Sequence, residues 1–358
     1  MNTTTPKTTT KQMQWESEKS AFVDFLGGKS FLEGAGPRKL RDDDNNRVEN
    51  WLRSYLCNEW RNDSTTFESF YIVSKRDPKA VERIKKRLSK DRAARNYQGT
   101  LGELRAFADL LNLGAFKTNY RGNKQAGCDF LVRMMNNTTV AFEVEVFTMQ
   151  DRPDCTIHHS KCETEVCPFG TPKKDSNVTL EMVCKIHSTK ERTKQVSQNT
   201  PALLYIDFQS MFPFGASIIE HCASLLEWNG AFTSGGVWLS FFGRNGQSVL
   251  ENASRHERLS CPKLPIPGLF SNKGCSPFAG AILAFPRGRA TAGGRLVYFE
   301  NPFADHPLDS IARDAILKHP DCNLQYSLWS AKHFRLVNYI KQQNNRSEVL
   351  FAELNKGF

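Results

Sequence analysis

GCDFLVRMMNNTTVAFEVEVF, residues 127–147, holds two strand-like runs joined by a turn. In the second run Glu143 and Glu145 alternate with apolar residues, and Asp129 stands at the head of the first. Because successive side chains of a strand point to opposite faces, both glutamates fall on one face, about 6.5–7 Å apart. Two carboxylates so close repel each other unless a cation lies beside them. The stretch therefore predicts a hairpin that presents acids to a metal ion, with Asp129 beside Glu143 if the register allows.

Carboxylate ligands of this kind suit Mg²⁺ (or Mn²⁺), which typically takes one or two carboxylates together with water and substrate phosphate. A further acid, Glu103, belongs to the helix expected directly before the hairpin. The alternative is an exposed edge strand whose acids are simply solvated. Since the run VAFEVEVF is strongly apolar, we expect it to be buried, and buried carboxylates need partners.

Helices and strands alternate after residue 99, which indicates an α/β core. A short polar tail at 1–14 is expected to be disordered, and 15–98 forms a helical, basic N-terminal region. The α/β core spans 99–300 and the C-terminal helical extension 301–358. Helices are predicted at 15–26, 44–61, 77–95, 99–114, 179–197, 215–228 and 326–343, and strands at 129–134, 140–147, 201–208, 236–242, 278–285 and 295–302.

A polar, aperiodic stretch at 150–178 interrupts this core and is rich in cysteine and histidine. A small insertion without apolar residues is where a structural Zn²⁺ would supply stability, through four tetrahedral nitrogen and sulfur ligands. The spacings match no standard zinc finger, so surface thiols and histidines in a loop are the alternative. The candidate ligands are Cys155, His158, His159, Cys162 and Cys167, with Cys184 and His187 further on.

Composition narrows the class of protein. No apolar run reaches 18 residues, which excludes a transmembrane helix, and the N-terminal segment lacks the apolar core of a secretory signal. Residence in the cytosol is therefore expected, where the ten cysteines would be reduced thiols or metal ligands. The net charge of +10 favours an anionic partner, nucleic acid first.

Residues 75–95 are strongly basic, with ten lysines and arginines against three acids. Four of them recur at helical spacing and would form one basic face: Arg83, Lys86, Arg87 and Lys90. Such a face either contacts the phosphates of a nucleic acid or is simply solvated.

The order of these features resembles the PD-(D/E)xK nuclease superfamily, whose members share the restriction-endonuclease-like fold. The resemblance implies an α/β fold with a mixed β-sheet flanked by helices. The resemblance covers about residues 97–210. It rests on a helix with an acid, a hairpin with an aspartate followed by an acid-x-acid pair, and a lysine-rich helix before the strand PALLYID. The matching positions are Glu103, Asp129, Glu143, Glu145, Lys185, Lys190, Lys194 and Gln195.

The resemblance implies roles for these residues. Asp129 and Glu143, with the carbonyl of residue 144, would hold one Mg²⁺, and Glu103 would be the helix acid. Glu145 stands where the family usually has lysine; it would accept the proton of the attacking water or join Glu103 at a second ion. Alternatively, Lys185 or Lys190 of the next helix would reach the site. Gln195 would point back to the site or to the phosphates, unless its helix face is simply solvated.

Two functions remain open. The first is a metal-dependent nuclease, most readily a DNA endonuclease, and a homodimer if both strands of a duplex are cut. The second is a catalytically inactive nuclease-like protein that binds nucleic acid or a partner protein in a defence or repair assembly. The chain has no G-x-S-x-G, Walker or G-x-G-x-x-G motif, so a serine hydrolase and a nucleotide-dependent enzyme lack support.

Overall fold

Contacts divide the chain into two compact units, Met1–Leu111 and Asn112–Phe358. The helix at 99–111, which the sequence analysis grouped with the α/β core, belongs to the first unit. The computed structural model describes residues 19–27, 64–91, 94–122, 127–135, 139–149, 195–197, 199–209, 214–223, 226–228, 231–233, 236–242, 268–270, 273–287 and 291–327.

The first unit is helical, with helical residues 19–25 followed by α4 (Ser64–Arg76), α5 (Pro78–Leu88) and α6 (Ala94–Leu111). Asp77 begins α5, because its side chain accepts a hydrogen bond from the Ala80 N–H at 3.0 Å and proline occupies the first turn. The helix predicted at 77–95 is thus two helices, and α4 was not predicted.

Aromatic side chains form the core of the first unit. Phe22 and Phe25 of the first helix pack on Phe70 of α4, with ring centroids 5.4 and 4.8 Å apart respectively. The buried Tyr97 of α6 donates its hydroxyl to the Leu26 carbonyl at 2.9 Å. This bond satisfies a carbonyl at the end of the first helix and attaches that helix to α6.

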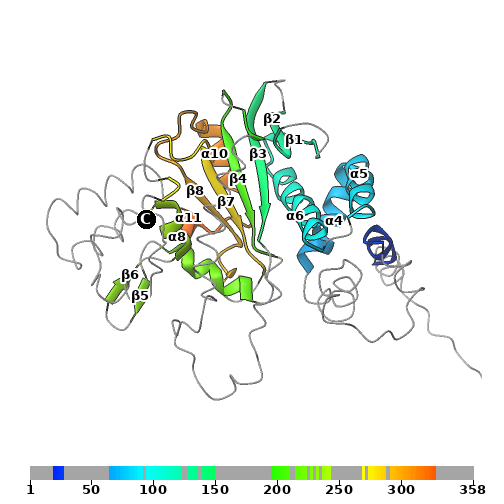
Figure 1. The fold of residues 1–358 in the computed structure, drawn as a ribbon, viewed down its shortest axis with the longest axis horizontal. Coiled ribbons are helices and arrows are strands. Elements are labelled where there is room, and N and C mark those ends of the chain that lie inside the picture. Colours follow the sequence, from blue (N-terminus) through cyan, green and yellow to red (C-terminus); the bar gives the residue numbers. More distant parts are fainter. Residues whose placement is uncertain are drawn as a thin grey trace, which may run out of the picture. The chain divides into compact units, whose positions relative to one another are not determined.

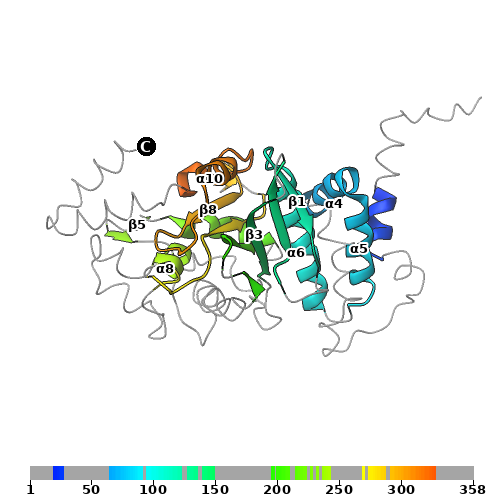
Figure 2. The same cartoon turned by 90° about the horizontal axis from the view of Figure 1, so that it is seen from above.

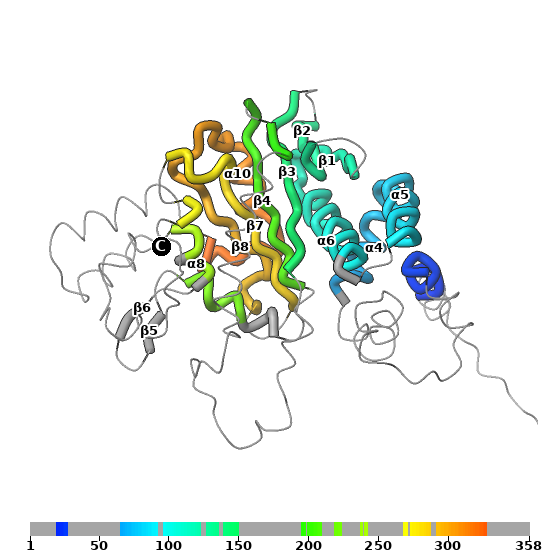
Figure 3. Tube along the Cα trace, in the orientation of Figure 1, coloured from blue at the N-terminus to red at the C-terminus, as the bar shows by residue number. Residues whose placement is uncertain are grey.

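The second unit is built on a mixed six-stranded sheet in the order β1-β2-β3-β4-β7-β8 (Figure 1). β1 to β3 form an antiparallel meander, β4 runs parallel to β3, β7 runs parallel to β4, and β8 closes the sheet antiparallel to β7. The trace in Figure 3 can be followed through this meander. The strands are β1 (Phe116–Tyr120), β2 (Phe130–Met134), β3 (Val140–Thr148), β4 (Ala202–Asp207), β7 (Gly280–Ala284) and β8 (Leu296–Glu300).

Helices cover both faces of this sheet, and Figure 2 shows α8 (Gly236–Phe242) and α10 (Ser310–Leu317) on opposite sides. The 3₁₀ helix η6 (Phe214–Cys222) joins α8 on one face, where Trp238 and Phe241 enter a large apolar cluster. The short hairpin of β5 (Leu226–Trp228) and β6 (Ala231–Thr233) and the single turn α11 (Leu324–Ser327) complete the described elements. Every described helix is too short or too polar to cross a lipid bilayer.

Several expected elements differ from the structure. GVWLSFF at 236–242, predicted as a strand, is α8, because its buried residues recur at helical spacing: Val237, Trp238, Phe241 and Phe242. The helix predicted at 215–228 is η6 followed by β5. β1 and α10 were not predicted. The strands expected around β2, β3, β4, β7 and β8 are confirmed within one or two residues at most ends.

Other predictions fall outside the described residues. These are the tail at 1–14, the helix at 44–61, the whole insertion at 150–178, all of the helix at 179–197 before 195, and the last helix after residue 327.

A steric prediction follows from the pairing of β7 with β8. A Cβ at Gly280 would lie 2.7 Å from the Phe299 carbonyl oxygen and 2.8 Å from the Tyr298 ring. We expect Gly280→Ala to lower the free energy of unfolding by about 1–3 kcal/mol, measured by urea denaturation. The control is Gly114→Ala, whose Cβ meets nothing within 4 Å and which should change stability by under about 0.5 kcal/mol. Equal effects of the two would contradict the close packing.

Candidate active site on strand β3

Glu143 and Glu145 lie on β3, a central strand between β2 and β4. They are 8% and 1% exposed. This excludes the alternative of solvated acids on an edge strand. Their side chains share a face of the sheet, while the buried Phe142, Val144 and Val146 occupy the other face, as the alternation predicts.

The strand register brings a third acid to this face. Phe130 of β2 pairs with Val144 of β3, so the preceding residue, Asp129, comes opposite Glu145. The sequence analysis expected Asp129 beside Glu143; that position faces Leu131 instead. Directly opposed residues of an antiparallel pair point to the same face. Asp129, 7% exposed, therefore joins the two glutamates; we call these three residues the acid face.

Each carboxylate of the acid face accepts a hydrogen bond. Oδ2 of Asp129 accepts from the Val146 N–H at 2.9 Å, and Oε2 of Glu143 accepts from the Ser197 N–H at 2.7 Å. The Gln195 amide lies against Glu145 and, with its nitrogen toward the carboxylate, donates to both oxygens, 3.1 Å from Oε2. Such hydrogen bonds compensate part of the solvation that a carboxylate loses on burial.

A short segment positions two of these donors. Val196 is buried in the apolar cluster to which η6 and α8 contribute, whereas its neighbours Gln195 and Ser197 are exposed. The anchored valine therefore holds the Gln195 amide at Glu145 and the Ser197 N–H at Glu143. Gln195 was a sequence-predicted site residue, and the structure brings it to the acid face. The Ser197 contact is a backbone bond that no side-chain pattern could reveal.

Arg121 is a neighbour of the acid face that sequence reasoning missed. It follows β1, its N–H donates to the Asp129 carbonyl at 2.9 Å, and its guanidinium acts on the pKa of the Cys128 thiol, which donates to the Phe130 carbonyl at 3.2 Å. Burial, and then the Glu143 carboxylate, raises the pKa of Cys128 to about 11, against the opposing effect of Arg121. The Arg121 guanidinium is thus close enough to Cys128, the residue before Asp129, to lower the pKa of its thiol.

Glu103, the predicted helix acid, lies in the first unit and pairs there with Arg87. Both guanidinium Nη atoms donate to the carboxylate, Nη2 to Oε1 at 2.9 Å and Nη1 to Oε2. The Glu103 side chain is 10% exposed and that of Arg87 25%. This bidentate ion pair connects α5 to α6, and the charges of Arg87 and Glu103 compensate each other.

The basic helix α5 displays the other predicted cations. Its buried face is Ala80, Val81, Ile84 and Leu88. Arg83 and Lys86 are exposed on the opposite side, as is Lys90 just beyond the helix. Arg87 alone of the predicted basic face is turned toward α6.

The other predicted site residues fall outside the described residues: Lys185, Lys190, Lys194, Cys155, His158, His159, Cys162, Cys167, Cys184 and His187. Among the residues that are described, no three His, Cys, Asp or Glu side chains form a group that could hold a metal ion.

The carboxylate oxygens of the acid face are suitable ligands for a divalent cation, whose remaining ligands would be water and substrate. Mg²⁺ is usually held by one or two carboxylates and keeps several waters, so it does not need three protein acids. Glu143 uses Oε2 to accept the Ser197 N–H, and within the described residues its Oε1 accepts no hydrogen bond. That oxygen is the clearest ligand position on this face.

Comparison with protein-family models, with curated proteins and with solved structures gives no match for this chain.

The charges around Cys128 predict its reactivity. Glu143→Gln removes a negative charge, so the pKa of the thiol should fall and alkylation by iodoacetamide at mildly alkaline pH should accelerate. Arg121→Met should raise that pKa and slow the reaction. The rate at Cys128 is measured by peptide mass spectrometry on the folded protein. The buried Cys222, whose pKa is raised by burial alone, is the control; parallel changes at both thiols would indicate unfolding and contradict the local effect.

The Glu103 pair predicts a coupling energy. In a double-mutant cycle with Arg87→Met and Glu103→Gln, urea denaturation should give about 0.5–3 kcal/mol of interaction. The reference cycle is the exposed pair Lys85–Asp24, 2.8 Å apart, which should couple by about 1 kcal/mol or less. Additive effects of the Arg87 and Glu103 substitutions would show that the pair contributes nothing to folding.

Proposed function

We propose that the chain is a metal-dependent nuclease that hydrolyses phosphodiester bonds, with the acid face of β3 as its active site. The observation that carries the proposal is three carboxylates on one face of a central, buried part of the sheet. Carboxylates in such a place lower the stability of a fold unless a cation or strong donors compensate them. The presence of three carboxylates at this place is therefore best explained by a catalytic role.

The strand arrangement supports a restriction-endonuclease-like core. A helix is followed directly by an antiparallel three-stranded meander, and the next strand, β4, lies parallel to β3. This order agrees with the helix, hairpin and further strand on which the resemblance to the PD-(D/E)xK superfamily rests. Asp129 directly precedes β2, and Glu143 and Glu145 lie on β3, which is consistent with the hairpin positions that the resemblance assigns to the acids.

Each residue of the acid face has a proposed role. Asp129 and Glu143 hold the divalent cation, which when bound supplies polarisation of the scissile phosphate. Glu145 accepts the proton of the attacking water, and the Gln195 amide fixes the orientation of its carboxylate. Gln195 is exposed, so it also meets the substrate from the solvent side.

Charge supports a nucleic-acid substrate. The chain carries a formal charge of +10, and Arg83, Lys86 and Lys90 on and beside α5 are exposed. Cations neutralise phosphates and release counterions on binding, which makes association strong at low salt. DNA is the proposed substrate.

An inactive, nucleic-acid-binding protein is the second candidate, and one observation favours it. Glu145 stands at the position of the superfamily's usual lysine, and within the described residues Gln195 is the neutral donor that contacts it. A neutral amide cannot stabilise the developing phosphate charge as an ammonium does.

Cleavage assays separate the two candidates. Purified protein is incubated with plasmid, linear duplex, single-stranded DNA and RNA, in Mg²⁺, Mn²⁺ or EDTA. We expect cleavage that requires the metal and falls about 100-fold or more in Asp129→Asn, Glu143→Gln and Glu145→Gln. The matched control, Glu220→Gln, changes an exposed glutamate on η6 and should keep full activity.

Absence of cleavage on every substrate, with nucleic-acid binding retained, would reject the enzyme and leave the binding protein. Cleavage that persists in EDTA or in Glu143→Gln would place the chemistry elsewhere.

A further inference from the structure

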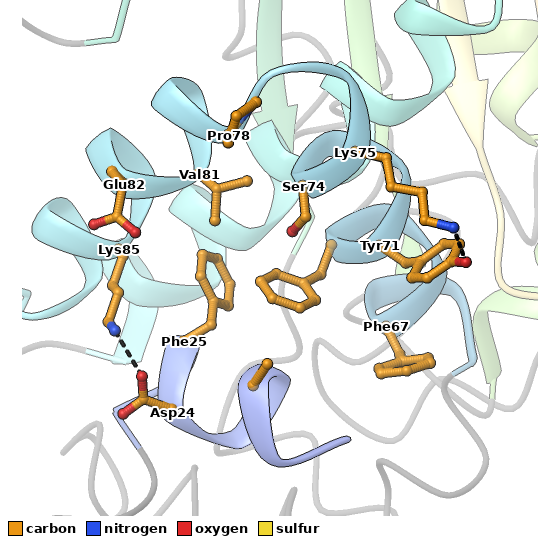
Figure 4. Close-up of a pocket in the computed structure, with 12 residues that line it drawn as sticks. Asp24, Phe25, Phe67, Tyr71, Ser74, Lys75, Pro78, Val81, Glu82 and Lys85 are labelled. Atoms are coloured by element: carbon orange, nitrogen blue, oxygen red, sulfur yellow. Dashed lines mark hydrogen bonds and ion pairs between the residues drawn. The ribbon is translucent and has the colours of Figure 1, made fainter. Parts of the chain in front are cut away.

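A cavity of about 470 Å³ opens in the first unit between helical residues 19–25, α4 and α5 (Figure 4). Its size falls within the range of about 300–1,000 Å³ that is usual for ligand sites. The lining is mainly apolar and includes four aromatic residues: Phe25, Phe67, Phe70 and Tyr71. Phe67 packs edge-on against Phe22 with ring centroids 5.3 Å apart, and Phe67 and Tyr71 are both only half-buried.

Two polar groups inside the cavity are available to a planar, polar ligand. Among the residues that the structure describes, the buried Ser74 hydroxyl has no hydrogen-bond partner, so its hydrogen-bonding capacity is left unsatisfied. The Lys75 ammonium lies 3.9 Å from the centroid of the Tyr71 ring and donates to its hydroxyl. Tyr71 thus already binds a cation on its face, and that cation can move to an incoming anion.

The charged residues that line the cavity sum to zero, whereas the surface around the cavity is positively charged. Two acids and two lysines line the cavity, so their formal charges cancel: Lys85 pairs with Asp24 at 2.8 Å, and Glu82 and Lys75 are the other two. Around it, α4 and α5 expose further cations at Arg76, Lys79, Arg83 and Lys86. A ligand that suits both parts has an uncharged aromatic group for the cavity and phosphates for the rim.

We propose that this cavity binds an unpaired base of a single-stranded nucleic acid, stacked on Tyr71 and Phe67, with the neighbouring phosphates on the exposed lysines and arginines. A paired base cannot enter, because both of its faces are already stacked in the duplex. Base stacking on an aromatic ring, combined with a basic surface that follows the backbone, is the physical basis of binding to single strands. The inference rests on the proposed function for the presence of a nucleic acid and adds which form of it is bound.

Fluorescence anisotropy in EDTA tests this, with the full chain and a labelled oligothymidylate. Tyr71→Ala should raise the Kd about 5- to 150-fold, which corresponds to the stacking of one base, while Tyr71→Phe, which keeps the ring, should bind as the wild type does. Ser74→Leu fills the cavity and should weaken binding as well. Circular dichroism checks that each variant keeps its helices.

Two further ligands make the test specific. An abasic oligonucleotide keeps the phosphates but lacks the bases, so its weaker binding should not respond to Tyr71→Ala. A duplex of the same length should likewise be insensitive to this substitution. Free thymidine monophosphate as competitor distinguishes a nucleotide site from a polymer site: displacement of the oligonucleotide at low micromolar concentration would overturn the proposal.

Equal Kd values for the wild type, Tyr71→Ala and Ser74→Leu would also overturn it. The result is independent of catalysis, because binding is measured without metal. Tyr71-dependent binding without any cleavage would reject the nuclease and keep this site. Metal-dependent cleavage without Tyr71-dependent binding would do the reverse.

Discussion

Burial of charge on β3 is the constraint on which the second unit depends. Glu143 and Glu145 occupy a strand with neighbours on both sides and apolar packing on its opposite face. An ionised carboxylate in such a place needs a donor or a cation. The Val146 and Ser197 N–H groups and the Gln195 amide meet part of that need, and the proposed metal ion would meet the rest.

The apolar cluster on the same face fixes the position of these donors. Leu204 pairs with Glu145 in the register, and it belongs to the cluster that includes Trp238 of α8 and Val196. Acids and apolar core therefore share one continuous face. Packing of Val196 determines where Gln195 and Ser197 lie, so the geometry of the acid face depends on side chains that carry no charge.

The hairpin could be predicted because its signal is local. Alternation in FEVEV gives the faces of β3 correctly, and β2 and β3 pair as the predicted antiparallel hairpin. The conditional expectation that Asp129 pairs with Glu143 was wrong, since Asp129 comes opposite Glu145 and the sequence between the two strands does not determine their register. α8 was mistaken for a strand because a short apolar run has no decisive period until its packing partners are known.

Long-range contacts were beyond the sequence. Nothing local indicates that Arg87 turns to Glu103 on the next helix, or that Arg121 comes beside Cys128. β1 was overlooked since FKTNY alternates with little apolar content. Gln195 was predicted through the family resemblance, whereas the residue that anchors it, Val196, was not.

Metal binding itself tests the central claim most directly. Titration of Mn²⁺ into the wild type, Asp129→Asn and Glu143→Gln, followed by electron paramagnetic resonance of the free ion, counts bound ions without requiring turnover. The account predicts that the wild type binds Mn²⁺, that Mg²⁺ competes for the site, and that both substitutions weaken binding strongly. Binding that is absent in the wild type, or equal in all three proteins, would contradict a metal site on the acid face.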